Sequence, residues 1–287
     1  MRFFIKILLS SILLLLSQNS FAVTINKTLY INSGIYTTVN NTTFPYLVFN
    51  DTDTFNSLNH VITISSIDTL ILKVINNDTV IHGFNIKGYA GINSILNPAD
   101  SISDTLTFAV QGLYIYYDSY KYPDYKNIGA GGMICVNNST SKKYYWNLKD
   151  FQSGFNNQIA ANNGVNWSQY DPDYFTINGK SFPDLQNDTT ARVLCNVGDT
   201  IHIFIANTGQ AAHSLHFHGF HSRIIYSTQS HQIGWVKDTF PLQKMDAMVL
   251  EMIPDKLGEY SVHDHNLIAV SGGGIHPNGM FIIMKVQ

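Results

Sequence analysis

Charged residues are scarce in this chain of 287 residues, because Asp, Glu, Lys and Arg together make up only 13% of it. The formal net charge is −3, and Lys and Arg form no run. A protein that binds nucleic acid usually carries a basic patch, which this composition does not provide. We therefore expect no nucleic acid as a partner, and the mild acidity indicates no other charged partner.

Cysteine is almost absent, with Cys135 and Cys195 the only two in the chain. In an oxidising compartment they can form one disulfide, which would join the end of the first half of the chain to the start of the second. They can equally remain two buried thiols. The sequence leaves both states open.

Long hydrophobic runs are absent after the N-terminus. Two positive residues precede the apolar stretch "ILLSSILLLL" (7–16), and the small-residue pattern "SFA" (20–22) follows it. This order predicts a secretory signal peptide over residues 1–22, with cleavage near Ala22. The alternative is an uncleaved anchor, for which the apolar run is short. We expect a secreted or periplasmic protein with no membrane span after signal cleavage.

The residues that are plentiful favour strands and turns. Hydrophobic residues make up 45% of the chain and aromatic residues 13%. Ile, Val, Tyr, Phe and Thr fit the pleated surface of a sheet, and Asn and Gly fit the turns between strands. Short alternating stretches bounded by Gly, Asn and Asp are typical of Greek-key β-sandwiches. The predicted fold class is therefore all-β.

Internal similarity indicates a tandem duplication. The matching pairs are "DTLILKVINND" (68–78) with "DTIHIFIANTG" (199–209), "GLYIYYDS" (112–119) with "GEYSVHDH" (258–265), and "GGMICV" (131–136) with "NGMFII" (278–283). Their order is kept and their spacing is nearly kept, as expected when one domain is copied after another.

The duplication divides the chain after the signal peptide into two domains of one fold. We expect domain 1 over residues 23–145 and domain 2, which carries the histidine clusters, over residues 171–287. The stretch 146–170 is polar and Asn-rich and is expected to connect them. The segment "DYFTINGKSFPD" (173–184) then opens domain 2.

Histidine is concentrated in two segments of domain 2. "HSLHFHGFHS" (213–222) holds four of the chain's eleven histidines, and "YSVHDHNLIAVSGGGIHPNGM" (260–280) holds three more. Successive side chains of a strand point to opposite faces. If both segments begin as neighbouring strands, alternate histidines therefore gather on one face and the residues between them gather on the other.

This alternation predicts two candidate metal sites. The first gathers His216, His218, His263 and His265. The second lies on the inner side of the sandwich and gathers His213, Asp264, His276 and Met280. Imidazole-rich sites suit copper, zinc or iron, and the thioether of a methionine favours copper at the second site. Ordinary structural or surface roles are expected for His60, His202 and His231, and His221 is left without a role.

These segments resemble the copper motifs of the multicopper oxidase superfamily, which includes laccases, ceruloplasmin and copper nitrite reductases. "HSLHFHG" resembles its H-P-x-H-x-H-G motif, and "HDHNLIAVSGGGIHPNGM" resembles its H-C-H motif with the following His and G-M. "DYFTINGKSFPD" resembles the start of a cupredoxin domain. The resemblance implies two tandem cupredoxin-like domains, copper as cofactor, and oxidation of a small-molecule or metal-ion reductant. It assigns His213 to a blue copper and the H-x-H pairs to a trinuclear cluster.

The sequence departs from the family pattern at both sites. Asp264 replaces the cysteine whose thiolate gives a blue copper its electronic character. In domain 1, "VIHG" (80–83) keeps only His82. The histidines available for a trinuclear cluster are therefore His82, His216, His218, His263 and His265. A rival placement, based on the duplication, instead matches His82 with His213 and Asp118 with Asp264.

Three functions follow from these features. The first is a secreted copper-dependent oxidoreductase without a blue copper site; within it, nitrite reductase chemistry is disfavoured because domain 1 lacks the corresponding cysteine. The second is a non-catalytic copper-binding or storage protein. The third is a metal-free structural cupredoxin module. The resemblance to two-domain relatives also predicts a homotrimer in which His82 of one chain faces domain 2 of another.

Overall fold

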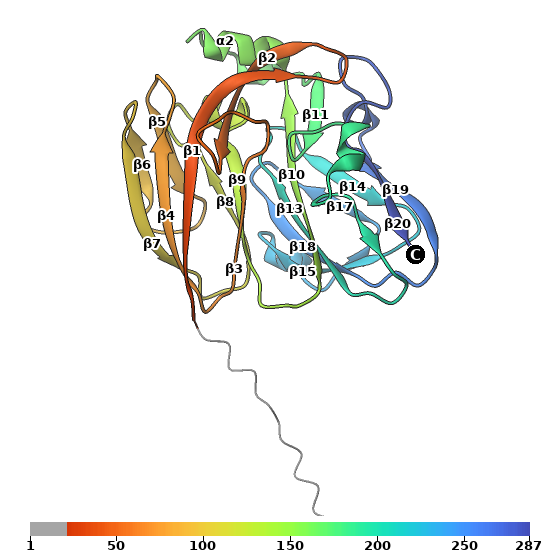
Figure 1. Ribbon diagram of the computed structural model, residues 1–287. Helices are drawn as coiled ribbons and strands as arrows, with labels where there is room; N and C mark the ends of the chain where they lie inside the picture. Colours follow the sequence, from red (N-terminus) through yellow and green to blue (C-terminus); the bar gives the residue numbers. More distant parts are fainter. Residues whose placement is uncertain (1–21) are drawn as a thin grey trace, which may run out of the picture.

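The structure is a computed structural model that describes residues 22–287. The expected signal peptide therefore lies outside the described residues, apart from its last position. No helix in the described part is long and apolar enough to cross a bilayer. The chain folds into two β-sandwiches that lie side by side (Figure 1).

The first sandwich contains β1 to β9. Its first sheet has the order β2 (Thr43–Asn50), β1 (Thr24–Thr37), β4 (Thr69–Asn76), β7 (Ser101–Thr107). Its second sheet has the order β3 (Val61–Ile64), β9 (Gly131–Val136), β8 (Gly112–Tyr117), β5 (His82–Ile86), β6 (Asn93–Leu96). β1 runs parallel to β4, and β4 runs antiparallel to β7.

The second sandwich contains β10 to β20. Its first sheet has the order β11 (Tyr174–Ile177), β10 (Lys142–Phe151), β13 (Ile201–Asn207), β18 (Ala247–Met252), β15 (Ser222–Ser227), β16 (Val236–Lys237). Its second sheet has the order β12 (Leu194–Cys195), β20 (Phe281–Val286), β19 (Gly258–Asp264), β14 (His213–Phe217), β17 (Thr239–Leu242). The helices are short: α1 (Asp124–Asn127), α2 (Ser153–Ala160), and 3-10 turns at Trp167–Gln169, Asp184–Asn187, Ser230–Gln232 and Leu267–Val270.

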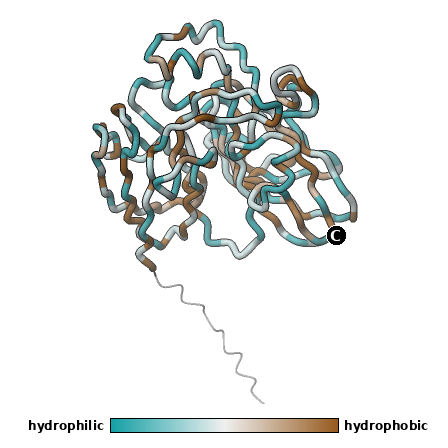
Figure 2. The backbone as a smooth tube through the Cα atoms, turned by 45° about the horizontal axis from the view of Figure 1, so that its top comes forward, coloured by the Kyte–Doolittle hydropathy of each residue, from teal (hydrophilic) through white to brown (hydrophobic). Residues whose placement is uncertain are grey.

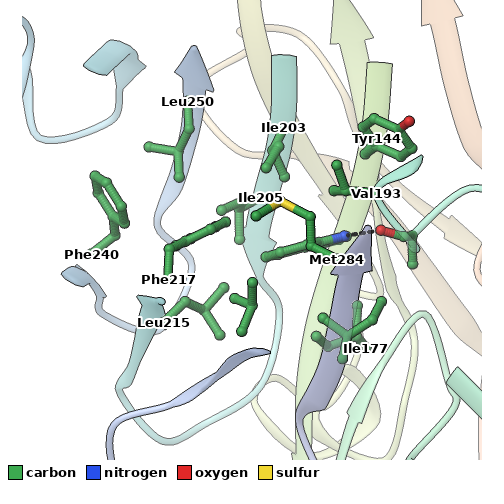
Figure 3. Close-up of a cluster of buried hydrophobic side chains, with 14 of the residues drawn as sticks. Tyr144, Ile177, Val193, Ile203, Ile205, Leu215, Phe217, Phe240, Leu250 and Met284 are labelled. Atoms are coloured by element: carbon green, nitrogen blue, oxygen red, sulfur yellow. Dashed lines mark hydrogen bonds between the residues drawn. The ribbon is translucent and has the colours of Figure 1, made fainter. Parts of the chain in front are cut away.

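Alternating hydrophobic residues build a separate core in each sandwich. β4 shows the pattern, with every second residue buried, and hydrophobic and hydrophilic positions alternate along many strands (Figure 2). In the second sandwich, Ile203 and Leu250 of one sheet face Phe217 of the other (Figure 3). Each fully buried side chain of this size contributes about 1.5–3 kcal/mol to folding. The prediction of an all-β protein built from two tandem sandwiches is confirmed.

The strand positions support the tandem duplication. The three matched pairs of segments fall on β4 and β13, on β8 and β19, and on β9 and β20. The order β3-β9-β8-β5 in the first sandwich repeats as β12-β20-β19-β14 in the second. The parallel pair β1 and β4 likewise has its counterpart in β10 and β13.

The expected connection over residues 146–170 is only partly a connection. Its first six residues belong to β10, which pairs with β13 inside the second sandwich. Although this stretch is polar and Asn-rich, its first part forms a strand whose apolar residues, such as Trp146 and Leu148, are buried. We propose to place the boundary between the domains at residues 137–141 instead.

An apolar interface joins the sandwiches. The outer faces of β8 and β9 pack on β13 and β18 through apolar side chains that include Ile115, Met133, Phe204 and Val249. Cys135 also lies in this interface, whereas Cys195 lies in the core of the second sandwich. Both cysteines are buried free thiols, so the alternative of a disulfide is not adopted.

Candidate metal centre

Four histidines gather on the outer face of β14 and β19, and we call them the histidine face: His216, His218, His263 and His265. The antiparallel register pairs His216 with His263, while Leu215 and Asp264 pair on the opposite side of the sheet. His218 and His265 follow the ends of the two strands and are exposed. The alternation of side chains thus brings together the four residues of the first predicted site.

The imidazole rings of the histidine face lie close to one another. The ring of His216 is 4.7 Å from that of His218 and 5.7 Å from those of His263 and His265, measured between centroids. The Nε2 atoms of His218 and His263 are 3.0 Å apart. Within residues 22–287, no three His, Cys, Asp or Glu side chains surround a point in a way that could hold a metal. Coordination therefore requires rotation of some of these rings.

Hydrogen bonds fix the orientation of two rings of the face. The Nδ1 of His216 is 2.9 Å from the Oγ1 of Thr239, and this hydroxyl donates to Asp238. The hydroxyl must therefore accept the Nδ1 proton of His216. The Nδ1 of His263 donates to the backbone carbonyl of Asp264 at 2.8 Å. Both rings then carry their proton on Nδ1 and present an Nε2 lone pair, as a metal-binding histidine does.

The donor set fits a copper ion chemically. Two nitrogens bound to one metal at about 2.0–2.1 Å, with an angle of about 90–110°, lie about 2.9–3.4 Å apart, which the Nε2 atoms of His218 and His263 satisfy. Burial lowers the pKa of His218, as do its neighbours His216 and His263, whereas Asp238 opposes them. His218 is thus kept neutral, which is the form that binds a metal.

The second predicted site has a different chemistry from the one expected. His213 is buried, with Nδ1 2.6 Å from Asp264 Oδ2 and Nε2 3.1 Å from Asp150 Oδ1. Burial lowers the pKa of His213, but hydrogen bonds to Asp150 and Asp264 outweigh this effect and raise it to about 9. His213 is therefore an imidazolium at neutral pH, and neither ring nitrogen has a lone pair for a metal.

The other two members of the second site differ in their exposure. His276 is exposed in the loop after the last 3-10 turn, and Met280 lies in the apolar core of the second sandwich. The position of His213 between two carboxylates argues against the predicted copper site of His213, Asp264, His276 and Met280. Strand parity placed the first two together correctly, but it did not reveal the second carboxylate.

Domain 1 repeats the buried ion pair. His82 is 1% exposed, with Nδ1 2.6 Å from Asp118 Oδ2 and Nε2 3.0 Å from Asp78 Oδ2. The backbone N–H groups of Gly83 and Tyr120 donate to Asp118. In domain 2, the N–H groups of Ser214 and Asn266 donate to Asp264 in the same way.

This repetition decides between the two placements of His82. His82 corresponds to His213, and Asp118 corresponds to Asp264, as the duplication predicted. His82 is therefore no ligand of the histidine face. Both of its nitrogens contact carboxylates inside domain 1, which leaves neither free for a metal shared with another chain. The homotrimer itself stays a prediction.

Asp150 is the residue of this centre that the sequence analysis missed. It is fully buried on β10 and also accepts hydrogen bonds from Tyr170 and from the N–H groups of Gln210 and Ala211. Burial raises its pKa, but the bonds to His213 and Tyr170 outweigh this and lower it. The sequence shows Asp150 only as a charged residue next to the end of the strand "YYWNLKDF", and no local pattern indicates its contact with His213.

The carboxylate that contacts Nε2 of the buried histidine comes from different sequence positions in the two domains, Asp78 in domain 1 and Asp150 in domain 2. The offset of the duplication aligns Asp78 with Gly209. A Cβ atom on Gly209 would lie 1.9 Å from Asp150 Oδ1. The carboxylate of Asp150 thus occupies the space that a side chain at position 209 would need.

Domain 1 has no counterpart of the histidine face. The duplication aligns His216, His218, His263 and His265 with Asn85, Lys87, Tyr117 and Ser119. The register is equivalent, since Asn85 pairs with Tyr117 as His216 pairs with His263. The imidazoles that could bind copper are therefore concentrated in domain 2.

Comparison with known proteins agrees with this architecture. Residues 154–277 match the sequence model of the multicopper oxidase family. No curated protein matches the chain by sequence. Among solved structures, the chain is similar to a blue copper oxidase from Nitrosomonas europaea, with 19% identity and a TM-score of 0.76 over 92% of this chain and 86% of the other.

Two further solved structures show the same fold. A multicopper oxidase, mgLAC, is 18% identical, with a TM-score of 0.76 over 93% of this chain and 87% of its own. A copper nitrite reductase from Nitrosomonas europaea is 16% identical, with a TM-score of 0.73 over 92% of this chain and 94% of its own. Both sandwiches are thus cupredoxin-like domains. The second half of the chain thus resembles the multicopper oxidase family in sequence, and both halves share the fold of these copper proteins.

Proposed function

We propose that the protein is an exported copper-binding protein that holds copper at the histidine face and has no blue copper. The observation that carries this proposal is the gathering of four imidazoles, two of them with Nδ1 protonated by hydrogen bonding. Imidazole nitrogen suits copper, and copper is the metal implied by the superfamily. The apolar stretch over residues 7–16 supports export through a signal peptide.

The chain's own residues prepare this face for a metal. Thr239 and the backbone carbonyl of Asp264 orient His216 and His263, and Asp238 places a negative charge near His216. Such outer partners typically change metal affinity by about 10–100-fold. A copper ion bound here would supply one-electron redox chemistry.

Electrons would have to reach this face without an internal thiolate relay. Asp118 and Asp264 stand where a blue copper would need cysteine, and each binds a buried histidine. We propose that a small-molecule or metal-ion reductant acts directly at the exposed His218 and His265. The second candidate function is copper storage or delivery without turnover, which the missing relay favours.

Copper titration of the mature protein tests the proposal. We expect nitrogen-coordinated Cu²⁺ in the electron paramagnetic resonance spectrum, without the intense visible absorption of a thiolate-bound copper. The double variant His216→Ala/His263→Ala should weaken copper binding by at least about a hundredfold. His231→Ala, which changes an exposed histidine outside the face, is the matched control. Unchanged copper binding by the double variant would refute the proposed site, and no copper binding by the wild type would favour the metal-free module.

Oxygen consumption by the copper-loaded protein separates the two candidate functions. A phenolic reductant or a reduced metal ion serves as the electron donor. Turnover that disappears in the His216→Ala/His263→Ala variant supports an oxidoreductase. Copper binding without turnover supports storage or delivery.

We also propose a homotrimer, now without any role for His82. Large apolar side chains in the segment that follows His265 along the chain, Leu267, Ile268 and Ile275, are at least half exposed and suit a subunit contact. Sedimentation velocity of the mature protein measures the oligomeric state. A monomer at all concentrations would contradict this assembly without affecting the copper site.

A further inference from the structure

A cavity of about 730 Å³ opens at the end of the first sandwich, on the side covered by α2. Its wall is formed by β1, β2, the residues leading into β5, and the segment around α1, and α2 packs against β2 (Figure 1). This volume lies within the range of about 300–1,000 Å³ typical of small-molecule sites. The cavity belongs to domain 1 and α2, so it is separate from the histidine face of domain 2.

The body of the cavity is apolar. Leu47, Ile128 and Ile159 line it and are almost fully buried. At its mouth, Ile35 is 59% exposed and Val80 is 44% exposed. Exposed apolar side chains at an opening, continuous with a buried apolar wall, favour entry of a molecule with an apolar body.

One end of the cavity is acidic. His82 and Asp78 line it, and Asp118 lies behind His82. With the imidazole protonated between two ionised carboxylates, this row carries a net charge of −1. Asp78 is its most accessible member, because its side chain is 10% exposed whereas those of His82 and Asp118 are at most 1% exposed.

Asp78 retains capacity to accept another hydrogen bond. Its Oδ1 accepts from the N–H and from the hydroxyl of Thr79, and its Oδ2 accepts from His82. An ionised carboxylate has about four acceptor sites. Burial raises the pKa of Asp78, but the bonds from His82 and Thr79 outweigh this and lower it. The carboxylate is therefore charged and able to receive a donor from a ligand.

Aromatic rings stand next to this carboxylate. Tyr120 and Tyr125 line the cavity with ring centroids 6.0 Å apart, and Tyr125 is 5.1 Å from the ring of His82. A carboxylate beside aromatic rings is a favourable environment for an ammonium group. The cavity lining also includes one cation, Lys121, whose side chain is exposed, donates to Asn162 Oδ1 and lies 5.5 Å from the Tyr125 ring centroid.

We propose that this cavity binds a small aromatic amine, with the ring in the apolar body and the ammonium at Asp78. The geometry favours an amine over a carboxylate because Asp78 lies at the more buried end of the cavity and has a free acceptor site, whereas Lys121 is exposed and already donates to Asn162. Binding needs no metal and does not depend on the function proposed for the histidine face.

Calorimetric titration in metal-free buffer with a chelator tests the proposal and keeps copper out of the result. The probes are 2-phenylethylamine, 2-phenylethanol and 3-phenylpropanoate, which share a ring and differ in the charge of the head group. We expect the amine to bind at least about tenfold more tightly than the alcohol, and the carboxylate to bind most weakly. Equal or tighter binding of the carboxylate, or no heat from the amine up to about 10 mM, would overturn the proposal.

Three variants locate the binding. Val80→Trp fills the exposed mouth and should abolish binding of the amine, whereas Val110→Trp changes a 62% exposed valine outside the cavity and should leave it unchanged. Asp78→Asn should reduce the preference for amine over alcohol to about twofold or less. Amine binding that survives Val80→Trp at wild-type affinity would place the ligand elsewhere and refute this site.

Discussion

His213 carries a proton where the copper motif of the family would place a metal ion. In the motif that the sequence resembles, the residues at 213 and 264 would be histidine and cysteine sharing a copper. Here a protonated imidazole lies between Asp264 and Asp150, and its positive charge compensates the buried carboxylates. A buried ion pair of this kind is stable only if its hydrogen bonds are satisfied, and backbone N–H groups complete them for both aspartates.

The raised pKa of His213 predicts how its contribution to stability depends on pH. The folded-state pKa of about 9 exceeds the unfolded value of 6.5, so the stabilisation is fully present below pH 6.5 and is lost as pH rises through 9. The difference in unfolding free energy between wild type and His213→Gln should shrink by about 2–3 kcal/mol between pH 7 and 10.

Guanidinium denaturation at several pH values measures this difference. His231→Gln is the control, because His231 is exposed and outside the ion-pair network. The control difference should stay flat across the same range. A His213→Gln difference that is independent of pH would mean that His213 is neutral in the folded protein.

At the scale of elements, strand alternation predicted the composition of the histidine face but not its chemistry. The period of two put His216 and His263 on one side of β14 and β19, and Leu215 and Asp264 on the other, as the register shows. What the sequence could not give was the partner of His213 from β10, which is 63 residues away in the chain. That contact depends on how the two sheets of the sandwich stack, which local patterns do not encode.

The turn between β13 and β14 offers a test of the two carboxylate arrangements. Asp150→Ala should destabilise the protein by about 3–5 kcal/mol, because it leaves His213 with one carboxylate. Gly209→Asp alone should also destabilise it, since its Cβ would lie 1.9 Å from Asp150 Oδ1. The double variant restores the domain 1 arrangement and should be more stable than Asp150→Ala by at least about 1 kcal/mol.

A double-mutant cycle by chemical denaturation measures this rescue. Additive losses in the double variant would show that an aspartate at position 209 does not reach His213. The backbone of this turn would then differ between the two domains, in addition to the different position of the aspartate that contacts the histidine.

At the scale of the molecule, the duplication predicted two sandwiches but not the polar contacts that join them. Apolar alternation identifies the face of each strand that lies in the core of its own sandwich. For β8 and β13 it does not decide whether the opposite face is also buried or is exposed. The structure shows the former, with Ile115 and Phe204 in one interface. It also places the buried Lys126 there, with its Nζ 2.7 Å from the carbonyl of Gly209 in the other sandwich.

Lys126 makes the contact between the sandwiches sensitive to pH. Burial lowers its pKa to about 7, which the charge of Asp150 opposes and that of Lys244 reinforces. Between pH 7 and 10.5 the unfolded chain therefore binds a proton that the folded protein lacks, so the contribution of Lys126 to stability rises with pH. This slope is opposite to that of His213, and the two partly cancel in the wild type between pH 7 and 9.

Lys126→Met isolates this effect, because methionine fills similar space without a charge. The unfolding free energy of wild type minus that of Lys126→Met should increase by about 4 kcal/mol between pH 7 and 10. Lys73→Met, at an exposed position of β4, should give a constant difference over the same range. A constant difference for Lys126→Met as well would mean that the amine stays charged in the folded protein, stabilised by Asp150 across the interface. If instead the difference rises as expected, Lys126 makes the contact between the sandwiches as a neutral amine above pH 7. Below pH 7 its buried charge then destabilises the folded protein.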